Sequence, residues 1–217
     1  MSNKVFISVL AVLVVALGAV FVFSGDGEAP TETSDKEAKE ILAIDEQNYR
    51  VKGPADATVE VVEFADFGCG FCAQASPEVS QLLVEYDGKI QYEFKPFSIP
   101  AGQNSVVAHR AAEAAGKQDK FFAMHDLLYA QQQVWGQSTK AKQIIDSYAE
   151  QIELDMDQYQ SDFKDSATLA VINDSKSEGV NVGVSGTPAF FVNGELVETQ
   201  GQYYQALAAK IDEILAE

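Results

Sequence analysis

The chain has 217 residues and 47% of them are apolar, so it can bury a sizeable core in one compact domain with an appendage, or in two small domains. Its 33 acidic residues outnumber its 15 lysines and arginines and give a net charge of −18 at pH 7. A surface of that sign repels phosphate backbones and anionic lipid head groups, which argues against nucleic acid as a partner.

An uncharged apolar run, VFISVLAVLVVALGAVFVF, occupies residues 5–23 and follows a short stub that ends in Lys4. As a helix, such a run of 19 residues reaches roughly 28 Å, close to the ~30 Å hydrocarbon core of a bilayer. Because Lys4 precedes the run, we expect residues 1–4 in the cytoplasm, residues 5–23 as a transmembrane signal-anchor, and the rest of the chain outside. The alternative is a signal peptide cleaved after Ser24 or Gly18, which would give a secreted or periplasmic protein. Either way the domain lies in the periplasm or at the cell surface, where disulfides persist.

The segments that follow indicate an α/β unit behind a tether. Residues 24–48 are acidic and polar and are expected to form the tether. Residues 57–67, ATVEVVEFADF, are rich in Val and Phe and predict a buried strand. From Cys69 the apolar residues recur at helical spacing, and residues 89–99 alternate in part, which indicates a helix and then a second strand.

A helical block occupies residues 103–178, which are rich in Ala, Gln and charged residues and are expected to form three or four helices. Asp155 and either Ser138 or Thr139 are expected to cap two of them. Strands return in residues 187–199, where an Asn-Gly pair between apolar runs indicates a two-residue hairpin turn. An amphipathic helix closes the chain.

Cys69 and Cys72 are the only cysteines of the chain and stand three residues apart in DFGCGFC, directly after the first predicted strand. Such a pair can be half of a zinc site, a structural disulfide or a redox pair. A closed zinc site needs four ligands, and the spacing of the only two histidines, His109 and His125, fits no finger pattern. A disulfide that closes so small a loop removes little entropy from the unfolded chain. The redox pair is therefore the favoured interpretation, and it requires no metal and no organic cofactor.

The place of Cys69 at the start of a helix explains why such a pair would be reactive. Unpaired N–H groups and the helix dipole favour a thiolate there and lower its pKa. Cys72 lies one turn further on the same side, close enough to bond Cys69. We therefore expect Cys69 to be the exposed nucleophile and Cys72 its shielded partner, which together exchange their disulfide with substrate thiols.

The chain carries VVEFADFGCGFC around the cysteines, GVSGTPAFFVNG at residues 183–194, a helical block between its strands, and GPADATVEVVEF as the lead-in to its first long strand. In these four features, residues 49–217 resemble the DsbA-like branch of exported thiol–disulfide oxidoreductases in the thioredoxin superfamily. The resemblance implies an α/β protein with the thioredoxin fold. In it a central mixed sheet is flanked by helices, with an inserted helical subdomain at about residues 103–178.

The resemblance also implies roles for several residues near the cysteine pair. Thr187 and Pro188 match the family's cis-proline loop, whose backbone pairs with the substrate beside the active disulfide. Glu63 stands six residues before the first cysteine, where the superfamily often has a buried acid that relays a proton to the second one. A solvent-facing strand position is the alternative for Glu63. Phe71 is expected to be exposed and, with Phe67, to offer apolar contact to unfolded substrates.

His109 and His125 are interpreted as ordinary helix residues and Trp135 as packing, without a part in the chemistry.

The expected function is an exported oxidase that promotes disulfide formation in unfolded or partly folded proteins with cysteines, as a monomer served by a membrane redox partner. The Gly-Phe pair between the cysteines and the Thr before the proline are similar to disulfide isomerases. An exported reductase or isomerase kept reduced by a membrane partner is therefore one alternative, and a non-catalytic, chaperone-like binding module is another.

Overall fold

The computed structural model describes residues 42–45, 48–100 and 102–217, which belong to one compact unit of the chain. In these ranges no helix is long and apolar enough to cross a membrane. The signal-anchor expected at residues 5–23 and most of the expected tether lie outside the described residues, so both stay predictions.

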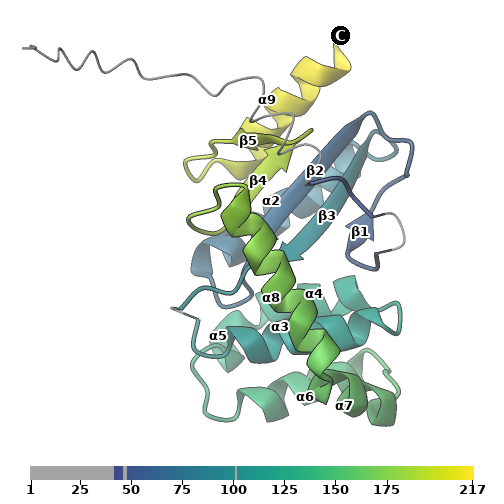
Figure 1. Ribbon diagram of the computed structural model, residues 1–217, viewed down its shortest axis with the longest axis vertical. Coiled ribbons are helices and arrows are strands. Elements are labelled where there is room, and N and C mark those ends of the chain that lie inside the picture. Colours follow the sequence, from purple (N-terminus) through teal and green to yellow (C-terminus); the bar gives the residue numbers. More distant parts are fainter. Residues whose placement is uncertain (1–41, 46–47, 101) are drawn as a thin grey trace, which may run out of the picture. The chain divides into compact units, whose positions relative to one another are not determined.

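A five-stranded mixed sheet forms the centre of the described part (Figure 1). Its strands are β1 (Val51–Lys52), β2 (Val59–Ala65), β3 (Ile90–Pro96), β4 (Ala189–Val192) and β5 (Glu195–Val197). Their order across the sheet is β1-β3-β2-β4-β5, and β2 and β3 run parallel while the other neighbours are antiparallel. The apolar run of β2 lies at the middle of the sheet because a central strand is covered on both faces, and only Glu60 of it is partly exposed.

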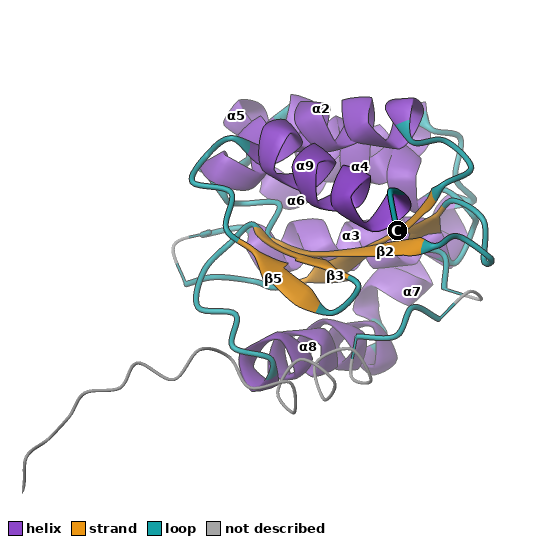
Figure 2. Cartoon of the chain, turned by 90° about the horizontal axis from the view of Figure 1, so that it is seen from above, coloured by secondary structure: helices purple, strands orange, loops and turns teal. Residues whose placement is uncertain are grey.

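Helices cover both faces of this sheet (Figure 2). α2 (Gly70–Glu85) and α9 (Tyr203–Leu215) lie together on one face, and α8 (Ser166–Asn181) covers the other. The inserted helices gather beyond the carboxyl ends of β2 and β3 (Figure 1); they are α3 (Ser105–Gly116), α4 (Phe121–Ala130), α5 (Gln132–Trp135), α6 (Ala141–Gln151) and α7 (Met156–Lys164). This arrangement confirms the thioredoxin fold with a mixed sheet and a helical insertion.

The helical block of the described chain contains six helices, α3 to α8, and the expectation of three or four was wrong. One expected helix is divided at Asp165, whose backbone is extended. The Asp165 side chain accepts a hydrogen bond from the Ala167 N–H, so the same residue ends α7 and caps α8. A side chain that satisfies a free N–H can start a new helix where the apolar periodicity alone would continue the old one.

Of the two helix caps expected from the sequence, one is confirmed. Asp155 caps α7, because its carboxylate accepts a hydrogen bond from Gln158 N at 3.0 Å. The cap expected at Ser138 or Thr139 is wrong. Lys140 is the residue that precedes α6, and Ser138 Oγ accepts from the Lys140 N–H ahead of the helix.

The β4–β5 hairpin turns at Asn193 and Gly194, as the sequence predicts. Their φ angles are 48° and 83°, which place both in the left-handed region that a two-residue hairpin turn requires. The Asn193 side chain also accepts a hydrogen bond from Glu60 N at 2.8 Å, so the turn is joined to the neighbouring strand β2.

Leu42 lies in the segment expected to form the tether, yet its side chain is only 2% exposed. It packs in a second core cluster between the sheet and α8, whose other buried members are Val62, Phe64, Phe97, Val184 and Phe191. The packed core therefore includes residue 42, ahead of residue 49 at which we expected the domain to begin.

Candidate active site

The two cysteines lie where β2 gives way to α2. Asp66 O accepts a hydrogen bond from Cys69 N at 3.0 Å, which closes a turn after the strand, and Cys69 is then the extended residue that precedes α2. Cys72, in the first turn of the helix, is fully buried as expected, whereas Cys69 is only 6% exposed. The open exposure expected for Cys69 is wrong, because the loop at Thr187 packs against its sulfur. Both cysteines are free thiols, so the structure describes the dithiol form.

The two thiols differ strongly in acidity. A hydrogen bond from the Cys72 thiol lowers the pKa of Cys69 to about 5, against the opposing effect of burial and with further help from the backbone N–H groups of Cys72 and Phe71. Burial raises the pKa of Cys72 far above the usual range of a thiol. A residue at the N-terminal end of a helix gains this stabilisation of its thiolate from the free N–H groups of the first turn. Of the two thiols, Cys69 is thus the one that ionises more readily, and Cys72 is the one that holds its proton.

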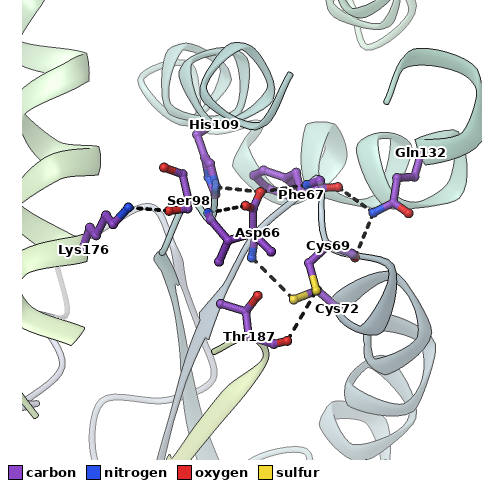
Figure 3. A network of polar contacts seen from close by, with 11 residues as sticks. Asp66, Phe67, Cys69, Cys72, Ser98, His109, Gln132, Lys176 and Thr187 are labelled. Atoms are coloured by element: carbon purple, nitrogen blue, oxygen red, sulfur yellow. Dashed lines mark hydrogen bonds and ion pairs between the residues drawn. The ribbon is translucent and has the colours of Figure 1, made fainter. Parts of the chain in front are cut away.

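The Thr187–Pro188 peptide bond is cis, as the resemblance implies. In the dithiol form, the Cys69 thiol donates a hydrogen bond from Sγ to the Thr187 carbonyl oxygen, 3.4 Å away (Figure 3). The pairing of β4 with β2 brings this loop to the cysteines from the far end of the chain. A backbone group is therefore placed directly beside the more acidic sulfur.

Glu63 on β2 is only 2% exposed, so the solvent-facing alternative is wrong. Tyr92 of β3 donates a hydrogen bond to Glu63 Oε2 at 2.5 Å, a partner that the sequence analysis missed. Burial raises the pKa of Glu63 to about 7, although the Tyr92 hydrogen bond lowers it, and the charge of Cys69 raises it further. Burial and the hydrogen bond with Cys69 raise the pKa of Cys72, and the charge of Glu63 raises it further. The carboxyl group is therefore electrostatically coupled to both sulfurs.

The two phenylalanines of the cysteine motif point to different environments. Phe71, between the cysteines, is 63% exposed as expected. Phe67 is fully buried, so its expected contact with substrates is wrong. Its ring packs in the core, with centroids 5.0 Å from those of Phe94 and Tyr129 and 5.7 Å from that of His125. Because Phe67 follows a central strand directly, it still lies beneath the helices, whereas Phe71 is at the tip of α2.

A buried contact between Asp66 and His109, which the sequence analysis missed, lies under the cysteine segment. The Asp66 carboxylate accepts hydrogen bonds from Gly68 N at 2.8 Å and Ile99 N at 2.6 Å, and His109 Nε2 lies 3.5 Å from its Oδ1 (Figure 3). The Asp66 N–H in turn donates to Cys72 Sγ at 3.5 Å. Burial alone would raise the pKa of Asp66, but the interactions with His109 and the Ile99 N–H hold it below its usual range. The signal available in the sequence is a carboxylate inside a mostly apolar run, three residues before the first cysteine.

Gln132 of α5 is a second residue beside the cysteines that the sequence did not single out. Its Nε2 donates hydrogen bonds to Phe67 O at 2.7 Å and to Cys69 O at 2.9 Å (Figure 3). Trp135 of the same helix is fully buried and donates from Nε1 to Leu128 O, which confirms its interpretation as packing. The site therefore takes one buried amide from the inserted helices.

Metal ligation was one alternative for the cysteine pair. In the ranges that the structure describes, there is no group of three or more His, Cys, Asp or Glu side chains that could hold a metal ion. His109 faces Asp66 rather than a cysteine sulfur. The arrangement at Cys69 and Cys72 is suited to thiol chemistry carried by the two sulfurs themselves.

Comparison with protein families gives a match to a family model described as Thioredoxin, over residues 45–213. Among curated proteins, the chain is similar to the Na(+)/H(+) antiporter NhaA 1 of Salinispora arenicola, with 36% identity over 178 residues, and to NhaA 3 of Salinispora tropica, with 36% over 173 residues. These matches cover 81% and 79% of this chain but 26% and 25% of those proteins. The chain therefore spans about a quarter of the length of the curated relatives it matches.

Solved structures with the same fold include thiol–disulfide exchange proteins. The alpha-DsbA2 protein of Wolbachia pipientis is 25% identical, with a TM-score of 0.68, and the match covers 85% of this chain and 99% of that one. A thioredoxin-like oxidoreductase of Silicibacter pomeroyi DSS-3 is 32% identical, with a TM-score of 0.60 and coverage of 77% and 99%. BdbD of Bacillus subtilis, at 20% identity, has a TM-score of 0.69 and coverage of 77% and 93%, a likeness that concerns the fold alone.

Proposed function

The chain belongs to the thioredoxin family, in the DsbA-like branch of thiol–disulfide oxidoreductases, and we propose that it exchanges a Cys69–Cys72 disulfide with thiols of substrate proteins. The observation that carries the proposal is the difference in acidity within the pair. The pKa of Cys69 is lowered to about 5, while that of the buried Cys72 is raised. Cys69 Sγ is therefore a good leaving group and nucleophile at neutral pH, and Cys72 Sγ is the protonated thiol with which it forms the disulfide.

The exchange proceeds in two displacements. A substrate thiolate attacks Cys69 Sγ, the Cys69–Cys72 bond breaks, and its electron pair goes to Cys72 Sγ, which takes up a proton. A second substrate thiolate then attacks the substrate sulfur of the mixed disulfide, and Cys69 leaves as a thiolate. The substrate has lost two electrons and the protein has gained them. Cys72 holds one proton, and the second proton of the two substrate thiols goes to solvent because Cys69 leaves as a thiolate. The cis loop at Thr187 offers its backbone to the substrate beside this reaction.

Glu63 is the group we assign to the proton on Cys72. It is buried on β2, and its pKa of about 7 lets it hold or release a proton at neutral pH. Phe71 is the group we assign to substrate contact, because it is a large exposed apolar side chain beside the reactive sulfur.

Oxidation of the substrate is the direction that the acidity of Cys69 favours. A stabilised thiolate stabilises the reduced form of the pair, which makes the corresponding disulfide a stronger oxidant. Reduction potentials in such proteins run from about −270 mV for thioredoxin to about −120 mV for DsbA. The pKa of about 5 at Cys69 supports a place toward the oxidising end.

The equilibrium of the full chain with glutathione tests both the exchange and its direction. We expect alkylation of Cys69 and Cys72 to give a potential closer to about −120 mV than to about −270 mV. A reduced, unfolded substrate protein should also acquire disulfides faster in its presence. A potential near about −270 mV would instead indicate a reductase or isomerase kept reduced by a membrane partner. If no reversible disulfide forms between the two cysteines, the exchange itself is refuted.

We further propose that the domain is exported and held at the membrane by residues 5–23. It would act there as a monomer on exported proteins with cysteines, and a membrane partner would re-oxidise it. The length of the uncharged run and the need for a compartment in which disulfides persist support this. The native protein should sediment with membranes, resist extraction by alkaline carbonate, and retain its N-terminal segment on sequencing. A soluble protein that begins at Gly25 would refute the anchor.

A further inference from the structure

A buried side chain of the helical insertion reaches across to the backbone of the cysteine segment. Gln132, the first residue of α5, is only 8% exposed. Its Nε2 donates to Phe67 O at 2.7 Å and to Cys69 O at 2.9 Å, so its two amide hydrogens engage the carbonyls on both sides of Gly68 (Figure 3). These carbonyls belong to the turn between β2 and α2. The backbone hydrogen bonds of the sheet and of the helix do not use their full hydrogen-bonding capacity.

The two acceptors matter because the turn is buried. A buried carbonyl without a partner costs free energy comparable to a lost hydrogen bond. Phe67 O accepts a hydrogen bond from Gln132, while Cys69 O accepts from both Gln132 and Ala73 N in the first turn of α2. Gln132 therefore connects the residue that enters the turn with the residue that carries the reactive sulfur.

Gln132 is itself held by a rigid support. The Asn104 side chain donates to three backbone carbonyls around the end of α5, those of Trp135, Gly136 and Ser138, at 3.0 to 3.2 Å. Trp135 is fully buried and bonded to Leu128 O. A side chain whose own element is fixed in this way can hold a partner within a few tenths of an ångström.

The opposite side of the same turn is fixed independently. Asp66 accepts from Gly68 N and Ile99 N and contacts His109 of α3. Gly68 itself has no room for a side chain, since a Cβ there would lie 2.3 Å from Ser105 Oγ. The turn that presents Cys69 is thus clamped between side chains of the insertion and the end of the sheet.

We propose that Gln132 is a positioning residue for the exchange reaction: its amide fixes the carbonyls that flank Gly68, and so sets the equilibrium between the dithiol and disulfide forms of Cys69 and Cys72. The inference rests on the proposed function, because this equilibrium has meaning only if the pair cycles. It assigns the helical insertion a part in the redox chemistry through a defined contact.

The physical link runs through the position of Cys69 at the start of α2. Its thiolate is stabilised by the Cys72 thiol and by the N–H groups of Phe71 and Cys72, and each of these interactions depends steeply on distance and direction. Gln132 holds the carbonyl of Cys69 itself. Without that bond the turn gains freedom, the thiolate loses stabilisation, and the dithiol form becomes less favoured relative to the disulfide.

The test is Gln132→Met in the full chain, because Met keeps the length and volume of the side chain and removes both donors. Gln133→Met is the matched control: Gln133 is the exposed neighbour in the same helix, and the chemical change is identical. We expect Gln132→Met to shift the equilibrium with glutathione roughly tenfold toward the disulfide, which converts to a potential about 30 mV lower. The thiolate of Cys69, followed by its ultraviolet absorbance, should titrate at higher pH. Gln133→Met should match the wild type in both measurements.

A merely structural role for Gln132 predicts a different result. In that case the melting temperature falls, but the potential and the titration of Cys69 stay at their wild-type values, and the proposal is overturned. If Gln132→Met does not fold, Gln132→Asn withdraws the same amide by one methylene, and the same two measurements decide. A wild-type protein that forms no reversible disulfide refutes the proposed function. A wild type that cycles and a variant with the same potential refute only the role of Gln132.

Discussion

Replacing Cys69 by Ser should abolish thiol–disulfide exchange and leave the fold intact. Serine is close to cysteine in shape, so the buried turn at the start of α2 keeps its packing, but an alkoxide oxygen cannot form the mixed disulfide. The rate of disulfide formation in a reduced substrate protein should fall to that of the uncatalysed reaction. The melting curve of the variant serves as the control for folding. Exchange at the wild-type rate in Cys69→Ser would show that the sulfur is not the nucleophile.

Replacing Cys72 by Ser should have a different consequence. The internal disulfide can no longer form, but the Cys69 thiolate can still attack a disulfide of a substrate protein and expel one of its two sulfurs as a thiolate. Cys69 can form a mixed disulfide with a substrate, but no internal thiol is left to release it. The complex should persist for minutes to hours, the timescale of uncatalysed disulfide rearrangement. Mass spectrometry of the trapped complexes should find the substrate cysteine bonded to Cys69, with apolar neighbours if Phe71 contacts the substrate. A chaperone-like binding module predicts the reverse, namely substrate binding that survives in Cys69→Ser and no trapped species in Cys72→Ser.

The long elements of this fold follow from local sequence patterns. The features that the sequence analysis did not predict depend on tertiary contacts. The Val- and Phe-rich run of β2 and the Asn-Gly turn are strong short-range signals, and both are where the sequence predicts them. The two-residue strand β1 has no periodicity to detect, and it exists because it pairs with β3. Leu42 belongs to the short apolar run ILAI (41–44) in an otherwise polar segment, and the core cluster between the sheet and α8 explains its burial.

The site shows the same division. The spacing of Cys69 and Cys72 after a strand favoured a redox pair, and the resemblance to the DsbA-like branch implied the burial of Glu63 beneath it. Gln132, by contrast, stands in the run Gln131-Gln132-Gln133, and nothing local separates the three. The packing of α5 decides which of them is buried against the cysteine segment, and its neighbours on both sides are exposed.

Replacing Glu63 by Gln should slow exchange by about a hundredfold at neutral pH, the lower end of what a positioned proton donor or acceptor contributes. Glutamine fits the same space and can still accept the hydrogen bond of Tyr92, so the change removes mainly the titrating group. In the wild type the rate should change with pH around the pKa of Glu63, which is about 7, and this inflection should be absent from the variant. Glu60→Gln is the matched control, because Glu60 lies on the same strand and is partly exposed. An unchanged rate and pH profile in Glu63→Gln would remove the residue from the mechanism.

The same substitution has a second, independent readout in stability, because burial disfavours the ionised carboxylate. Between pH 4.5 and about 7 the unfolded chain has released the proton of Glu63 while the folded chain retains it. The free energy of unfolding of the wild type should therefore fall as the pH rises through this window, by roughly 3 kcal/mol for this one group. Glu63→Gln carries no such loss, so its stability relative to the wild type should improve from pH 4 to pH 8. If stability responds in this way and the exchange rate does not, Glu63 is buried as the structure shows but takes no part in moving the proton of Cys72. If both respond, the same burial that destabilises the charged carboxyl group is what makes it a proton donor and acceptor at neutral pH.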